Sequence, residues 1–392
     1  MALVVDVDSH WTFPWEFDLE RGPLKAFAAK LGGKARLMAT FLADDLIRSL
    51  PVDERPSPDV LFPELVRSDG VRTNIPIHWE RGRDYARADE RIVWMDKVGI
   101  DYAIVNSGGF PAAFPLLEDL KDRQRYCTAA NEVLADALKD HRDRLGMVTY
   151  VDLNDLDWAI GELGRRRDAG SRVLSIRAEP VGGKSLGHPH FDRLWSALVD
   201  MGMIVSLHIG LAPSLFGDWG RLGLDTATPE GRAAFFRMSN SQRYQSAELF
   251  LSALLYGGVF ERHPKLTVLI AELYAFWMPV FVRRHAGLSH KAGTNLLGEW
   301  PYPVSADQYL RRQVRVSPLI GLGDVDALQT LQAIPDMTVF SSDYPHTEGN
   351  ADPIALYGEG LNRIPAELRE RFMGGSMQER FEVMGDPLPM VA

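Results

Sequence analysis

The stretch Val339-Phe340-Ser341-Ser342-Asp343-Tyr344-Pro345-His346 ends a strand-like apolar run with two polar side chains. An aspartate and a histidine follow the run, three residues apart. The chain begins in the same way, with Leu3-Val4-Val5-Asp6-Val7-Asp8-Ser9-His10. Catalytic groups of α/β barrels lie at the carboxyl ends of the strands. Both ends of this sequence therefore predict a carboxylate and an imidazole at the same rim.

Short apolar runs alternate with longer helical patterns between these two stretches. Most of the runs are continuously apolar, which is typical of parallel strands buried on both faces. Eight such runs separated by helices predict a closed (β/α)₈ TIM barrel. The alternative is an open doubly wound sheet, but no G-x-G-x-x-G follows the first run. The predicted strands span 3–8, 102–106, 146–151, 172–177, 203–208, 266–272, 313–317 and 337–342.

Helical spacing of apolar residues predicts helices over 89–99, 131–140, 155–166 and 191–201. Two stretches exceed the minimal barrel repeat. Residues 16–85 are rich in proline and charge, and we expect an insertion that caps the barrel after the first strand. Residues 209–245 form a long predicted loop after the fifth strand, and long loops in compact folds usually carry function. No domain boundary is visible, so residues 1–392 are predicted to form one domain.

Composition excludes several classes of protein. The 392 residues carry a net charge of -10 and no basic cluster, which argues against nucleic-acid binding. The single cysteine, Cys127, permits no internal disulfide and no thiolate-rich zinc site, and we expect it to be a packing residue. No signal peptide and no apolar window of about 20 residues appear, so we expect a cytoplasmic protein without a membrane span.

Carboxylates and imidazoles at strand ends indicate a metal site. Asp6, Asp8 and His10 alternate along the first strand and share one face. Unpaired carboxylates in a buried strand are costly, and a cation would remove that cost. The alternative is a salt-bridged aspartate beside a surface histidine. Asp343 and His346 flank Pro345, which keeps Tyr344 out of helical geometry and favours two side chains directed into the barrel mouth.

Two further candidates end the fifth and sixth predicted strands. His208 follows a run of apolar residues, where a core histidine is the alternative to a metal ligand. Glu272 is the last residue of another apolar run. Its buried carboxylate needs a partner, which could be a metal or an arginine such as Arg177. Other histidines precede strands and are predicted to be structural: His188, His190 and His263. No G-x-S-x-G elbow and no phosphate-binding P-loop appear.

These motifs resemble the amidohydrolase-related family of TIM-barrel metalloenzymes, which includes decarboxylases. The matching segments are 7–10, 191–195 leading to His208, 260–264 leading to Glu272, and 342–346. The resemblance implies metal ligands at Asp8, His10, His208 and Asp343. The family's hydrolases and decarboxylases typically have a histidine where this chain has Glu272. The strand-four lysine of carbamate-bridged dizinc members is also absent, which disfavours that class.

Three carboxylates and three imidazoles are the donors that iron, manganese and zinc share. One divalent ion would leave the set at about −1, and two would leave it positive. Glu272 could bridge two ions. This composition resembles the family's dinuclear non-heme iron, or iron–manganese, oxygenases. Aromatic residues near the predicted strand ends fit an apolar substrate, although loop packing is the alternative: Trp11, Phe13, Phe110, Phe216 and Trp219.

Three hypotheses follow. In the first, two metal ions held by the six candidates catalyse oxygen-dependent hydroxylation of an apolar or partly apolar small molecule, with Asp343, His346 and Glu272 as catalytic groups. An external electron donor would be required, because no flavin or NAD signature appears.

In the second hypothesis, Asp8, His10, His208 and Asp343 hold one zinc or manganese ion of a decarboxylase or hydrolase. In the third, the barrel is a non-catalytic subunit. By analogy with the family, we expect a homo- or hetero-oligomer.

Overall fold

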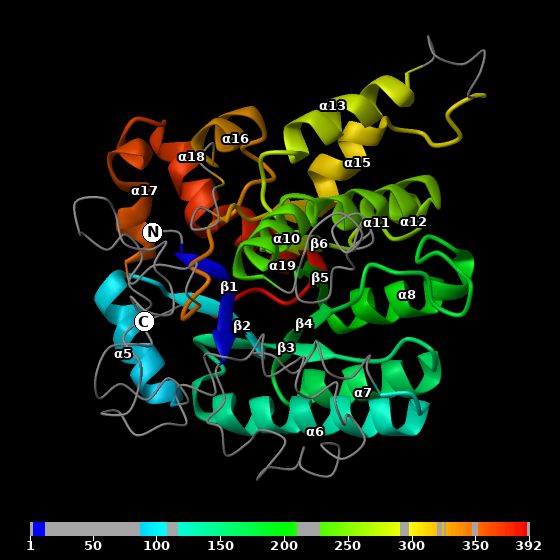
Figure 1. Ribbon diagram of the computed structural model, residues 1–392, viewed down its shortest axis with the longest axis horizontal. Helices are drawn as coiled ribbons and strands as arrows, with labels where there is room; N and C mark the ends of the chain where they lie inside the picture. The colour runs from blue at the N-terminus through cyan, green and yellow to red at the C-terminus, as the bar shows by residue number, and fades with distance from the viewer. Residues whose placement is uncertain are drawn as a thin grey trace.

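Parallel strands form one continuous sheet in the computed structural model (Figure 1). Each strand pairs with the next one along the chain, in the order β1 to β7. The model describes residues 3–11, 87–107, 117–209, 228–290, 298–319, 324, 327–346 and 352–389. The strands are β1 (Val5–Trp11), β2 (Tyr102–Ser107), β3 (Leu145–Tyr150), β4 (Ser171–Ser175), β5 (Ile204–His208), β6 (Val268–Ala271) and β7 (Val314–Val316).

The segment 337–344 closes this sheet into a barrel. It forms parallel bridges with β7 at Val316↔Thr338 and with β1 at Ser9↔Tyr344. Backbone hydrogen bonds support both seams, including Val339 N–H to the Val316 carbonyl at 3.0 Å. On the other side, the Asp343 N–H donates to the Asp8 carbonyl at 2.8 Å. The predicted eighth strand is therefore present as an extended segment that is held at separate bridges, and the predicted TIM-barrel fold is confirmed.

Helices surround the strands and alternate with them along the chain (Figure 1). They are α5 (Ala88–Val98), α6 (Leu120–Leu138), α7 (Leu156–Asp168), α8 (Asp192–Met201), α10 (Pro229–Ser241), α11 (Tyr244–Tyr256), α12 (Val259–Arg262), α13 (Met278–Leu288), α15 (Ala306–Gln313), α16 (Ala327–Ala333), α17 (Pro353–Asn362), α18 (Ala366–Glu370) and α19 (Ser376–Met384). Short turns are η6 (Lys139–His141), η7 (Pro189–Phe191) and the π-helix η11 (Arg371–Gly375).

Local sequence explains where the crossover helices begin and end. Asp119 caps α6 by accepting from the Asp122 N–H, and Asp155 caps α7 in the same way from Trp158. Gly99 ends α5 with φ 84°, and Gly202 ends α8 with φ 68°. Both glycines adopt the left-handed conformation that non-glycine residues rarely take. Helices α5 and α8 consequently return the chain directly to the next strand.

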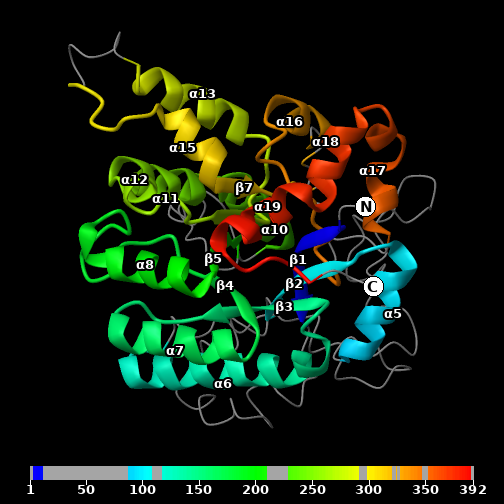
Figure 2. The same cartoon turned by 180° about the vertical axis from the view of Figure 1, so that it is seen from behind.

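The core consists of a barrel interior and two outer layers. Inward residues such as Val148, Val173 and Leu269 pack with Met377 and Phe381 of α19. Figure 2 shows α19 lying across the end of the barrel opposite to the carboxyl ends of the strands. The outer layers fill the space between strands and helices. The polar groups at the carboxyl ends of the strands are thus held by a barrel whose opposite end is covered by α19.

Several predicted elements are longer than expected or lie elsewhere. The helix predicted over 131–140 is the second half of α6, which begins at Leu120. The predicted cap at 16–85 lies outside the described residues, as do residues 210–227 of the predicted loop at 209–245. The rest of that loop is largely helical, because α10 spans Pro229–Ser241. Cys127 is buried in the core, as predicted.

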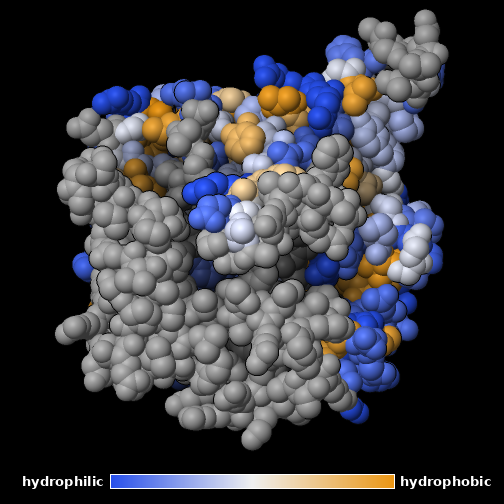
Figure 3. Space-filling model, in the orientation of Figure 1, coloured by the Kyte–Doolittle hydropathy of each residue, from blue (hydrophilic) through white to orange (hydrophobic). Residues whose placement is uncertain are grey.

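Exposed apolar side chains are scattered over the helices. The coloured part of the face in Figure 3 shows small orange areas separated by hydrophilic ones. Isolated apolar residues such as Val93 on α5 are ordinary on a protein surface. No helix among the described segments combines the length and the apolar character needed to cross a bilayer.

A candidate metal centre at the carboxyl ends of the strands

The first donors lie near the end of β1 and are almost completely buried. Asp8 is 1% exposed and His10 is 2% exposed. The pairing of β1 with β2 shifts register between Asp6 and Ser9, so the strand is irregular where the donors lie. Such irregularities are typical of strands that re-aim side chains beside active sites. Asp8 and His10 then meet, with 3.4 Å between Oδ1 and Nε2.

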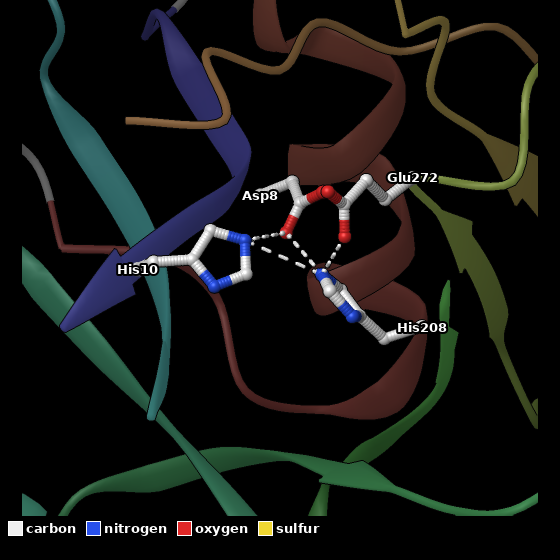
Figure 4. Close-up of side chains that lie close together, drawn as sticks. All are labelled: Asp8, His10, His208 and Glu272. Carbon is white, nitrogen blue, oxygen red and sulfur yellow. Dashed lines mark hydrogen bonds and ion pairs between the residues drawn. The ribbon is translucent and has the colours of Figure 1, made fainter. Parts of the chain in front are cut away.

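His208, the last residue of β5, completes a triangle of donor atoms (Figure 4). Its Nε2 lies 3.4 Å from Asp8 Oδ1 and 3.3 Å from His10 Nε2. A tetrahedral shell with metal–ligand bonds of about 2.0–2.1 Å has edges of about 3.3–3.4 Å. Two nitrogens and one oxygen are therefore spaced as three corners of a metal coordination shell.

Glu272 follows β6 and directs its two oxygens towards different histidines. Oε2 lies 2.8 Å from His208 Nε2, within the group drawn in Figure 4. Oε1 lies 3.8 Å from His346 Nδ1. Arg177, the arginine considered as an alternative partner, instead forms a bidentate pair with Glu179. The buried Glu272 carboxylate therefore faces imidazoles on both sides.

Asp343 and His346 complete the cluster from the closing segment. Asp343 Oδ1 lies 3.2 Å from His10 Nε2 and 3.0 Å from His346 Nδ1. The His346 ring stacks on His10 with a centroid distance of 3.7 Å. Neither oxygen of the buried Asp343 carboxylate accepts a hydrogen bond within the described part of the chain. A cation would satisfy these oxygens.

The six candidates divide into two overlapping groups whose donor atoms lie within 4.8 Å of one another. One group contains Asp8, His10, His208 and Glu272, and the other contains His10, Glu272, Asp343 and His346. All six residues predicted from strand ends thus converge. Their three carboxylates and three imidazoles are a chemically suitable donor set for divalent manganese, iron or zinc.

The titration behaviour of the cluster reflects its excess of negative charge. Burial lowers the pKa of His208, but the carboxylates of Glu272 and Asp8 reverse this and raise it to about 10. Burial raises the pKa of Glu272, and the imidazoles outweigh that effect, so that the net pKa lies well below its usual range. The pKa of Asp8 is lowered for the same reasons. A proton on His208 therefore balances charge that a metal ion would otherwise balance.

The backbone is strained at two of the donors. Glu272 has φ 56° and Asp343 has φ 54°, and Tyr274 beside the first has φ 61°. Non-glycine residues seldom adopt this left-handed conformation, which costs of the order of 1–3 kcal/mol and clusters at functional sites. The orientation of the Glu272 and Asp343 side chains therefore comes with a loss of fold stability.

Supporting residues that the sequence analysis did not identify hold the donors in place. Asn106, near the end of β2, donates from Nδ2 to Asp8 Oδ1 at 3.0 Å. Tyr150 of β3 donates in turn to Asn106 Oδ1 at 3.2 Å. The buried Arg91 of α5 donates to the His10 carbonyl and to Ser9 Oγ. Asn106 was detectable, because it ends an apolar run just as His208 does.

Among the predicted substrate-pocket aromatics, Trp11 lies within the described residues. It is buried in the cluster outside the barrel, with Arg91 5.7 Å from its ring centre, and it is not among the converging donors. The remaining four, Phe13, Phe110, Phe216 and Trp219, lie outside the described residues. The histidines predicted to be structural occupy other places: His263 pairs with Asp192, and His188 caps a short turn before α8.

Comparisons with known proteins agree with this architecture. A model of the amidohydrolase family matches residues 7–376. An amidohydrolase from Mycobacterium avium subsp. paratuberculosis K-10 has a similar structure, with a TM-score of 0.66 and 19% identity over 97% of this chain and 98% of that one. No curated protein matches the chain.

Structures of decarboxylases are also similar. 2,6-Dihydroxybenzoate decarboxylase from Rhizobium has a TM-score of 0.62 at 17% identity, over 98% of this chain and 99% of that one. A dihydroxybenzoic acid decarboxylase from Polaromonas sp. JS666, with bound manganese and 2-nitroresorcinol, has the same score and identity over 98% of both chains. Identities this low show a shared fold, whereas the family model spans nearly the whole sequence. The chain therefore belongs to the amidohydrolase family and is a metal-dependent enzyme with that family's barrel fold.

Proposed function

We propose that the protein is a divalent-metal-dependent decarboxylase of a small, partly apolar carboxylic acid. The observation that carries this proposal is Arg243, a cation beside the donor cluster that forms no ion pair with a carboxylate of the described residues. Its Nη1 donates to the carbonyl of Ile209, at 3.4 Å, next to His208. Its buried Nε has no hydrogen-bond partner within the same part of the chain. A guanidinium of this kind is suited to a substrate carboxylate, which it can bind through two parallel hydrogen bonds.

The electrostatic surroundings support this role for Arg243. Burial lowers the pKa of Arg243, and the charge of Glu272 is the largest effect that opposes the decrease. The guanidinium therefore lies within electrostatic range of the donor cluster. Solved structures of similar fold include decarboxylases of dihydroxybenzoate and of 5-carboxyvanillate. These neighbours support an acidic aromatic substrate class for this chain.

Four residues would hold the metal ion in this reaction: Asp8, His10, His208 and Asp343. When bound, the ion would supply Lewis-acid polarisation of substrate oxygens and neutralise negative charge. Arg243 would orient the carboxyl group. In the chemical step the bond between the ring carbon and the carboxyl carbon breaks, carbon dioxide leaves, and the electron pair remains on the ring carbon. A proton must then reach that carbon.

We assign the delivery of this proton to Glu272 and His346. Glu272 is buried, at 3% exposure, and cannot exchange directly with solvent. The side chain of His346 is 28% exposed, and its Nδ1 lies 3.8 Å from Glu272 Oε1. This separation is too long for direct transfer, so in this proposal one water relays the proton from His346 to Glu272, which passes it to the substrate.

A second candidate function is a dinuclear oxygenase. The specific observation in its favour is that the two oxygens of Glu272 face different histidines, as in a bridging carboxylate. Two divalent ions, iron or an iron–manganese pair, would leave the six-donor set with a net charge of about +1. Oxygen, an external electron donor and an apolar substrate would then be required.

Metal stoichiometry and product analysis distinguish these functions. The protein is purified from cells supplied with iron, manganese and zinc, and metals are counted by mass spectrometry. One ion per chain and anaerobic release of carbon dioxide from a hydroxybenzoic acid panel support the decarboxylase. Two ions and oxygen consumption with a chemical reductant support the oxygenase. A metal-replete protein that shows neither reaction with either substrate class contradicts both.

Replacement of Arg243 tests substrate recognition. Arg243→Met should raise KM for the acid by at least about tenfold and lower kcat less, because the interaction is made in the ground state as well as the transition state. The matched control is Arg125→Met, which removes the same charge from the exposed surface of α6. Equal kinetic constants for wild type and Arg243→Met would exclude the arginine from substrate binding.

A further inference from the structure

Two arginines lie buried at the floor of the barrel, at the opposite end from the metal centre. Arg315 of β7 is paired in register with the inward-facing Leu269 of β6 and is 2% exposed. Arg380 of α19 is 3% exposed. It reaches the beginning of β6, whereas Glu272 lies beyond the end of the same strand. Figure 2 shows α19 in this position across the barrel end.

Within the described part of the chain, both guanidinium groups donate to neutral acceptors. Arg315 Nη1 donates to the carbonyls of Arg311 and Val314, at 3.1 and 2.9 Å. Arg380 donates to Thr267 Oγ1 and to the Lys265 carbonyl, both at 3.0 Å.

The buried Nε of Arg315 has no hydrogen-bond partner among the described residues. Neither arginine forms an ion pair within the segments that the structure describes. The nearby carboxylates have other partners on the surface. Asp336 pairs with Arg311 at 2.8 Å, and Glu379 pairs with Arg371 at 3.0 Å.

The guanidinium groups of Arg315 and Arg380 thus lack a counter-ion among the described residues. A buried charge is costly unless it is paired, and a second charge of the same sign nearby increases the cost. Burial, and then the charge of Arg380, lower the pKa of Arg315 to about 9. At pH 7 both groups nevertheless remain charged. Inward positions of barrel strands usually carry apolar residues, so two unpaired guanidiniums there need a specific explanation.

We propose that a small inorganic anion binds between Arg315 and Arg380 and stabilises the barrel floor. The planar guanidinium fork favours an oxyanion such as phosphate or sulfate, whereas the burial of both side chains favours a smaller ion such as chloride. The shared chemistry is a compact anion that accepts hydrogen bonds from several N–H groups, including the free Nε of Arg315. This site does not depend on the reaction proposed at the other end of the barrel.

Thermal unfolding at constant ionic strength tests the site. The metal-replete protein is prepared in gluconate buffer and titrated with phosphate, sulfate or chloride. The expected result is a saturable increase in Tm of about 2–5 °C with at least one small anion, because a ligand that binds only the folded state stabilises it. Calorimetric titration of the same anion should give one site per chain. The anion that saturates at the lowest concentration identifies whether an oxyanion or a halide is bound.

Substitutions of the two arginines provide a second test of the anion site. Arg315→Met and Arg380→Met should abolish the saturable increase, while Arg371→Met, which removes a surface arginine with a carboxylate partner, should retain it. If the buried variants do not fold, calorimetry on the wild type still decides the question. Non-saturating effects that are equal for all anions, or an anion response that survives in Arg315→Met, would overturn the proposal.

Discussion

The position of a single carboxylate depends on a short hydrogen-bond chain. The amide of Asn106 holds one oxygen of Asp8, near the end of β1, and so limits rotation of this carboxylate. Tyr150 fixes the other end of the same amide. Side chains that orient metal ligands typically affect metal affinity by about 10–100-fold when they are replaced. The precision of the centre therefore rests partly on residues that would not touch a metal.

Replacement of Asn106 by alanine should weaken metal binding by about 10–100-fold, because Asp8 loses its orienting donor. Competition with a chromophoric chelator measures the affinity. Asn154→Ala, at an exposed asparagine that bonds Asp152, is the matched control and should bind metal normally. An Asn106→Ala protein with wild-type affinity would show that Asp8 is positioned by other contacts.

For single residues, the sequence predicts well which residue types form the site. It predicts poorly which distant residues contact them. Asp8, His208 and Glu272 were identifiable because each interrupts an apolar run at a strand end. The role of Arg243 was not, because it begins a helix far along the chain from Glu272. Only the three-dimensional path of α10 and α11 brings that arginine to the cluster, and no local pattern encodes this path.

At the scale of elements, η11 packs tightly against the residues that lead into the first strand. A Cβ atom added to Gly374 would lie 1.8 Å from the Leu3 carbonyl oxygen. The helix turn can contact the strand only because no side chain stands between them. The same turn bonds to the closing segment, since the Phe340 N–H donates to the Phe372 carbonyl at 3.0 Å. Gly374 therefore supports the seam where the barrel closes.

Gly374→Ala should lower the free energy of unfolding by about 1–3 kcal/mol, because backbone must move to admit the methyl group. Chemical denaturation measures this change. Gly164→Ala in α7 is the control: nothing lies within 4 Å of its added Cβ, so this substitution should stabilise the helix by up to about 1 kcal/mol. Equal stabilities for the two variants would contradict the packing argument.

Helices α11 and α13 are joined by a titratable contact. The Tyr256 hydroxyl and His285 Nδ1 are 2.7 Å apart. Burial, and then the charge of Arg284, lower the pKa of His285 to about 4. The unfolded chain takes up this proton near pH 6.5, before the folded protein does. Stability from this site is therefore complete above pH 6.5 and is lost as the pH falls towards 4.

The two pKa values set an upper limit of about 3 kcal/mol on the stability that His285 loses over this pH range. His285→Gln should flatten the dependence of unfolding free energy on pH between 6.5 and 4.5. His141→Gln, at a more exposed histidine paired with Asp89, should preserve the dependence. A wild-type slope in His285→Gln would assign the titration to another group.

Element boundaries show where local patterns fail. The first half of α6 is rich in charged residues such as Asp122 and Arg123, so apolar spacing reveals only its second half. The closing segment has a strand's sequence but pairs at isolated bridges, because Asp343 turns the backbone to positive φ. The barrel itself was predictable, since alternation of apolar runs and helices extends along the chain.

At the scale of the molecule, the six donors connect four separated parts of the barrel: β1, β5, the exit of β6 and the closing segment. A bound cation would link the seam between the first and last strands to the opposite wall. Its removal would leave three buried carboxylates to repel one another. Metal binding is therefore expected to couple to the stability of the whole barrel.

Metal removal should consequently lower Tm by several degrees, since a ligand at 100 times its Kd contributes about 2.7 kcal/mol. Scanning calorimetry before and after treatment with a chelator measures the change, and added manganese should reverse it. Asp343→Asn, which removes one carboxylate charge, should respond less to manganese. An unchanged Tm in protein verified to be metal-free would show that the cluster folds independently of a cation.

The closing seam has a consequence for biosynthesis. A ribosome releases Asp8 and His10 long before it adds Asp343 and His346, and the first strand has no neighbour on that side until the closing segment is synthesised. A chain that stops before this segment would lack two of the six donors and an edge partner for β1. Binding of a metal ion by the full donor set therefore reports that synthesis has passed the closing segment.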